Sequence, residues 1–207
     1  FFVGRLIAPA AAGMIERSGG SMEARVQPRI EGAILLAMVG AALTGPLAGL
    51  ASPVTALHGL LLMLAGALAI TRLLRWQLWR CSARPDLICL GIGYSWLGLG
   101  LIVLGLSRGF DFGLARPAAT HAITIGALGT LTTCIMLRTR LLRLRHELTR
   151  FGPAFMTMTG LIGLATLARL LLADSAAGLL LAATAWMLAL GLLFVLLSRY
   201  RQRFQPG

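Results

Sequence analysis

Six long apolar stretches occupy most of this chain, and they constrain its fold more than any other feature. An α-helix rises 1.5 Å per residue, so about 20 apolar residues cross the ~30 Å hydrocarbon core of a bilayer. We therefore predict an all-α fold, a polytopic transmembrane helical bundle. The predicted spans are residues 32–51, 54–74, 87–107, 118–137, 153–173 and 177–198.

The regions outside the spans define the predicted domain organisation. Residues 1–31 combine a short apolar segment with a polar connection, residues 32–198 form the bundle, and residues 199–207 form a basic tail. The chain begins without an initiator methionine, in the middle of an apolar run. We expect that a further N-terminal membrane portion precedes it, or that the chain acts as a homo-oligomer.

Arginine recurs in alternate connections between the spans. It is frequent before the first span, after the second, after the fourth and after the last, whereas the short turns at 51–53 and 174–176 contain none. Basic residues near span ends favour the cytoplasmic side of a membrane. The N- and C-terminal ends of the chain are therefore both predicted to be cytoplasmic, and an even number of spans returns the chain to the side from which it started.

The strong positive charge does not indicate nucleic-acid binding. The net charge is +12, but 57% of the residues are hydrophobic, only 13% are charged and the mean hydropathy is +0.83. A soluble domain has about a quarter of its residues charged. We interpret the arginines as a topology signal that contacts anionic lipid headgroups, so the predicted partner is the lipid bilayer.

Three ionisable side chains fall inside predicted spans. His58 and His121 lie near the beginnings of 54–74 and 118–137, and Arg169 lies near the end of 153–173. Ionisable groups in a membrane are costly unless they are paired or face a polar cavity, so they are candidates for function. With the predicted topology, all three lie at one depth, in the outer third of the membrane.

This combination of side chains is suited to a metal cofactor. Neutral imidazole binds haem iron or copper, and a guanidinium matches a carboxylate such as a haem propionate. We predict His121, His58, Arg169 and Thr124 as cofactor-binding residues, with the two histidines as metal ligands. The alternative is that the histidines bond to neighbouring helices and Arg169 reaches the headgroups.

The surroundings of His121 strengthen its candidacy. On a 3.6-residue period, Thr124, Ile125, Leu128 and Thr132 share its helix face. We predict that this stripe lines a narrow polar seam inside the bundle. The alternative is that the threonine hydroxyls bond to carbonyls of their own helix.

The span-four sequence carries a family resemblance. Residues 120–130 read THAITIGALGT and are followed by Met136-Leu137-Arg138. This block resembles the His-Ala-x-Thr-x-Gly-x-x-Gly-Thr and Met-x-Arg signature of the NnrS family of bacterial membrane proteins. Further matching fragments lie along the whole chain: Gly4 to Pro9, Arg72 to Trp76, Gly93-Tyr94-x-Trp96, Ala168-Arg169 and Trp186.

The resemblance implies a multi-pass inner-membrane protein that binds haem, with b-type haem expected, and copper. It also implies a link to nitric oxide stress and denitrification. The family pattern supports His121, Arg138 and Arg169, and it does not include His58. The chain departs from the pattern at Gly91, where the family has a histidine, and after span four, where it reads LLRLRH over 141–146.

Two functions remain open on the sequence. The first is a haem-binding, alternatively copper-binding, membrane protein of the nitric oxide stress response. The second is a membrane permease or structural subunit that has lost the cofactor site. The sequence does not decide whether the protein is an enzyme.

Overall fold

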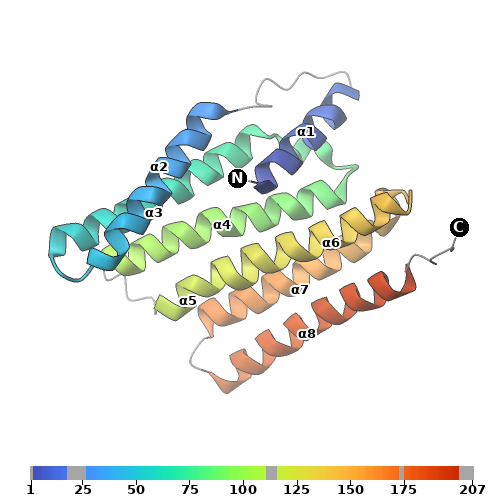
Figure 1. The fold of residues 1–207 in the computed structure, drawn as a ribbon. Coiled ribbons are helices and arrows are strands. Elements are labelled where there is room, and N and C mark those ends of the chain that lie inside the picture. The colour runs from blue at the N-terminus through green and yellow to red at the C-terminus, as the bar shows by residue number, and fades with distance from the viewer. Residues whose placement is uncertain (1, 18–26, 111–115, 173–174, 201–207) are drawn as a thin grey trace, which may run out of the picture.

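The computed structural model describes residues 2–17, 27–110, 116–172 and 175–200, and every named element in these ranges is a helix (Figure 1). The elements, in chain order, are α1 (Phe2–Arg17), α2 (Pro28–Thr44), η2 (Gly45–Leu47), α3 (Ser52–Arg75), η3 (Leu78–Cys81), α4 (Pro85–Gly109), α5 (Arg116–His121), η4 (Ala122–Gly129), α6 (Thr130–Arg143), η5 (Leu148–Phe151), α7 (Gly152–Leu171) and α8 (Ala176–Arg199). The all-α prediction is confirmed.

Six of these helical stretches are long and apolar enough to cross a membrane. They are Pro28–Leu47, Ser52–Arg75, Pro85–Gly109, Ala119–Arg143, Leu148–Leu171 and Ala176–Arg199. Each overlaps one of the six predicted spans and differs from it by a turn or two at the ends. The predicted apolar segment at the N-terminus is the helix α1, which packs against α4 and η3.

Proline and glycine set several helix boundaries. α2, α3, α4 and α7 each have proline in the first two helical positions, where the missing N–H would have no intrahelical partner. α2 ends at Thr44, and Gly45-Pro46 begins a short 3₁₀ turn, since proline lacks the N–H that would continue the helix. Gly49, with φ of +104°, lies in the turn before α3.

α4 is the central helix of the bundle and the most deeply buried of the six spans. It pairs with α3 through glycines that bring the two backbones together. A Cβ on Gly59 would lie 2.6 Å from Cα of Gly109, and a Cβ on Gly66 would lie 2.5 Å from the carbonyl oxygen of Gly98. Small residues at such crossings allow the close packing that holds helices together in lipid.

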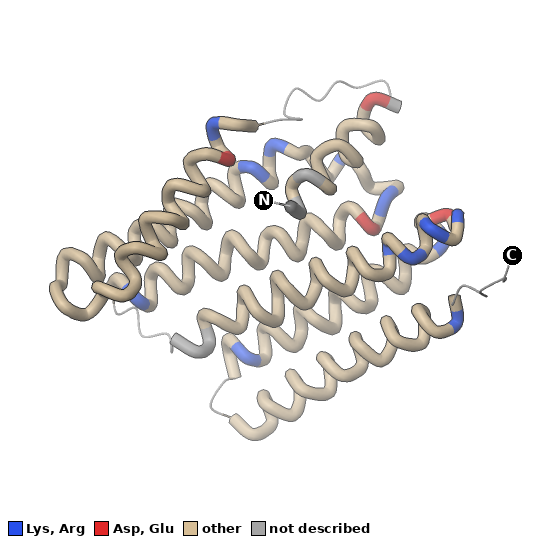
Figure 2. The backbone as a smooth tube through the Cα atoms, viewed as in Figure 1, with Lys and Arg blue, Asp and Glu red and all other residues tan. Residues whose placement is uncertain are grey.

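Figure 2 shows that most described arginines lie at one end of the bundle, where α2 begins and α8 ends. Arg108 and Arg169 lie at the opposite end, near the ends of α4 and α7. The alternation of arginines along the sequence therefore becomes a separation between two ends in space. The connections 18–26, 111–115 and 173–174, and tail residues 201–207, lie outside the described residues.

Candidate functional site

A π-helix begins immediately after His121. Residues Ala122–Gly129 form this element, between the short α5 and the longer α6. π-helices are rare, and they occur frequently at functional sites. Its buried residues are Ala122, Gly126, Ala127 and Gly129, and a Cβ on Gly129 would lie 2.5 Å from the Trp186 ring of α8. The small residues of η4 therefore make room for the aromatic side chain.

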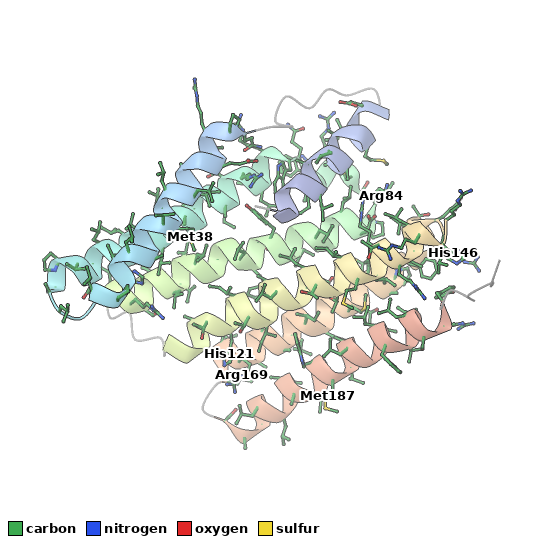
Figure 3. All side chains as sticks on the ribbon, viewed as in Figure 1. Met38, Arg84, His121, His146, Arg169 and Met187 are labelled. Atoms are coloured by element: carbon green, nitrogen blue, oxygen red, sulfur yellow. The ribbon has the colours of Figure 1, made fainter. Side chains whose placement is uncertain are left out.

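His121 is paired with Arg169 across the bundle. Nη2 of Arg169, on α7, lies 2.9 Å from Nε2 of His121, and both side chains are half-buried (Figure 3). A guanidinium can only donate hydrogen bonds, so Nε2 of His121 accepts. An imidazole that accepts at Nε2 is neutral and carries its proton on Nδ1. The lone pair of Nε2 is therefore directed toward the guanidinium.

The pair lines an open groove of about 660 Å³ between η4, α7 and α8. The groove residues are His121, Thr124, Ile125, Arg169, Leu179, Ala182, Ala183 and Trp186. Its volume lies within the ~300–1,000 Å³ of small-molecule and cofactor sites. The walls are mainly apolar, and the imidazole, the guanidinium and the Thr124 hydroxyl are the polar groups that it contains.

The predicted stripe below His121 does not line a seam inside the bundle. Thr124 and Thr132 are exposed, and the Leu128 side chain is 56% exposed. These three residues do share one helix face, but that face points outward, and only Thr124 and Ile125 of the predicted stripe line the groove beside His121. The Thr124 hydroxyl donates to the Thr120 carbonyl at 3.1 Å, as the alternative interpretation proposed.

His58 lies in a different part of the same end of the bundle. It is 4% exposed, on α3, and it does not line the groove that contains His121. Its Nδ1 lies 3.0 Å from the Ala41 carbonyl oxygen and 3.3 Å from the Thr44 hydroxyl, and its Nε2 lies 3.5 Å from Nη1 of Arg108. The imidazole thus connects α2, α3 and α4.

The structure therefore brings three of the four predicted residues together. His121, Arg169 and Thr124 share one groove, and His58 has its own arginine partner. No group of three or more His, Cys, Asp or Glu side chains suited to a metal ion occurs among the described residues. A metal in the groove would depend on a single protein imidazole.

Three ion pairs at the arginine-rich end, formed by the two acidic residues Asp86 and Glu31, were missed in the sequence analysis. Asp86 is completely buried and accepts hydrogen bonds from Arg84, at 2.9 and 3.0 Å, and from Arg138. Glu31 pairs with Arg72, which is 4% exposed. An acidic residue in the first turn of α2 and of α4 was the available signal, since acidic side chains stabilise helix N-termini.

A family model described as NnrS protein matches residues 1–201. The comparisons with curated proteins and with solved structures found no match.

Proposed function

The chain belongs to the NnrS family, since the matching model covers residues 1–201 of its 207, and from this premise we propose that it is a haem-binding inner-membrane protein of the bacterial nitric oxide stress response. The observation that carries the proposal is the His121–Arg169 pair in a groove of cofactor size. The six apolar helices support a multi-pass membrane location.

The groove contains each type of chemical group that a haem site requires. A haem needs an axial ligand, a partner for its carboxylates and an apolar surface for its ring. His121 offers a neutral imidazole, Arg169 a guanidinium, and Ile125, Leu179 and Trp186 offer apolar walls. When bound, the haem would supply an iron centre able to bind a small gas molecule.

The roles of the two polar side chains follow from their hydrogen bond. The Nε2 lone pair that accepts from Arg169 is the one that a metal ion would take. The guanidinium would then donate to a carboxylate, for which its planar donor pair is well suited. Thr124 would contribute a hydroxyl at the edge of the same groove.

The visible spectrum of protein purified with haem available tests the proposal. We expect a Soret band in the unmodified protein and its loss in H121A. The matched control is H146A, because His146 lies at the other end of the bundle, in ring contact with Phe151 and Tyr200. H58A should also retain the band, because His58 does not line the groove that contains His121.

Metal analysis of the same samples separates the alternatives. Iron in a one-to-one ratio with the protein supports the haem proposal, and copper that is lost in H121A would identify the imidazole as a copper ligand instead. Protein with neither metal nor a Soret band would contradict the proposal and favour a permease or structural subunit.

A further inference from the structure

A second groove lies between α6 and α8, at the opposite end of the bundle from the His121 groove. Both helices end there, at the arginine-rich end (Figure 1). The groove has a volume of about 300 Å³ and is lined by Met136, Thr139, Arg140 and Arg143 of α6 and by Leu197 of α8. It therefore combines two cationic side chains with apolar ones.

The α6 residues of this groove lie on one face of the helix, because they are three or four positions apart. The face ends in the two arginines, in the last turn of α6. Deeper in the bundle the outer surface is mainly apolar, since Met136 and Leu128 are 45% and 56% exposed. In a membrane this surface changes from apolar to cationic in the direction in which a phospholipid changes from acyl chain to headgroup.

The guanidinium of Arg140 is held in place by α8. Its Nε donates a hydrogen bond to the Tyr200 carbonyl oxygen at 2.9 Å, and the side chain is half-buried. Nη1 and Nη2 form no hydrogen bond with the residues that the structure describes. They remain able to donate to a ligand in the groove, from a side chain whose conformational freedom is already reduced.

The groove has two positive charges and no negative charge among the described residues. No Asp or Glu lines it, and neither of its arginines belongs to an ion pair there. At the same end of the bundle, Arg72, Arg84 and Arg138 are each paired with a carboxylate. Arg143 is exposed, so a ligand reaches it from outside the bundle. Planar guanidinium groups match the oxygens of a phosphate, so the groove is suited to an anionic phosphate group.

We propose that this groove is a binding site for an anionic phospholipid, whose phosphate accepts hydrogen bonds from Arg140 and Arg143 and whose acyl chains lie along Met136 and the outer surface of α6. The bound headgroup connects α6 to α8. The proposal goes beyond the general attraction of basic residues to anionic lipid, because it depends on these two arginines and not on others at the same end. It does not depend on haem binding.

Native mass spectrometry of the full chain, titrated in detergent with phosphatidylglycerol, tests the proposal. We expect saturation at one tightly bound lipid per chain. Phosphatidylethanolamine with the same acyl chains should bind about tenfold more weakly, because its ammonium group would face two guanidinium groups. R140M/R143M should weaken binding of phosphatidylglycerol about tenfold or more. The matched control is R75M/R150M, which removes two exposed arginines that do not line the groove and should leave binding unchanged.

Two further variants separate lipid binding from folding. R143M alone keeps the hydrogen bond between Arg140 and Tyr200, and it should weaken binding about fivefold. T139F narrows the groove and leaves both charges in place. The Thr139 hydroxyl donates only to carbonyls of its own helix, at 2.8 and 3.1 Å, so this substitution removes no contact between helices. Binding in T139F should also fall about fivefold or more.

Several outcomes would overturn the proposal. A loss of similar size in R75M/R150M and R140M/R143M would show only attraction to surface charge. Unchanged binding in R140M/R143M or in T139F would place the lipid elsewhere. Equal affinity for phosphatidylethanolamine would show that the headgroup charge is not recognised. Displacement of phosphatidylglycerol by millimolar inorganic phosphate would assign the groove to the free ion instead.

Discussion

Arg169 on α7 donates a hydrogen bond to Nε2 of His121, 48 positions earlier in the chain, with 2.9 Å between the nitrogen atoms. His58, the other histidine in a predicted span, also has an arginine neighbour, since its Nε2 lies 3.5 Å from Nη1 of Arg108. The two pairs differ in their surroundings. His121 lines a groove of about 660 Å³, whereas His58 is buried between three helices.

Replacing Arg169 should weaken haem binding without removing the axial ligand. In R169M the carboxylate partner is lost, and a hydrogen bond to a charged group is worth about 1.5–3 kcal/mol, so haem affinity should fall about tenfold or more. R169K keeps the charge but not the planar pair of donors, so its haem affinity should lie between those of R169M and the unmodified protein. Haem titration followed at the Soret band measures the affinity. Equal affinity in R169M and the unmodified protein would contradict this role.

Asp86 is expected to be a structural residue. Its carboxylate is completely buried and bonded to Arg84 and Arg138, and removal of one partner from a buried ion pair costs about 3–5 kcal/mol. D86N should therefore lower the thermal midpoint of the detergent-solubilised protein substantially. E147Q is the control, because Glu147 is exposed. A midpoint in D86N as high as in E147Q would contradict the prediction.

The close approach of α3 and α4 predicts that two glycines differ sharply in how well they tolerate replacement by a large side chain. G66L would force a side chain against the backbone of Gly98, and overpacking costs about 1–3 kcal/mol or more. G160L is the matched control, since a Cβ on Gly160 meets no atom within 4 Å. Yield of monodisperse protein after detergent extraction should fall in G66L only. A loss of similar size in both variants would argue against this helix pairing.

The separation of arginines between the two ends predicts the orientation in the membrane. A reporter enzyme that is active only outside the cytoplasm should be active when fused at residue 175 and inactive when fused at residue 146. The first position follows α7 at the arginine-poor end, and the second follows α6 at the arginine-rich end. The reverse pattern of activity would show that the topology is opposite to the predicted one.

Much of the fold follows from the sequence because bilayer thickness dictates span length. The six apolar runs predict the six long helices. Spans and loop charges also place His58, His121 and Arg169 at one end of the bundle. These are local properties that a linear sequence contains.

Partners across the bundle could not be predicted in the same way. The pairing of Arg169 with His121 depends on the rotation of α7 and of α5, which no residue pattern specifies here. The same is true of Leu128 and Thr132, because a residue pattern groups them on one helix face and does not specify that this face points outward. The Arg72–Glu31 pair likewise depends on how α2 packs against α3.

We propose that the imidazole of His121 holds a haem iron in the groove beside Arg169, and ligand rescue of H121G is the sharpest test of this role. Apoprotein of this variant is titrated with haem, with and without added imidazole, and the Soret band is followed. We expect that H121G alone gives no specific band and that free imidazole restores the spectrum of the unmodified protein. A full band in H121G without imidazole would contradict the claim, because another side chain would then be the ligand.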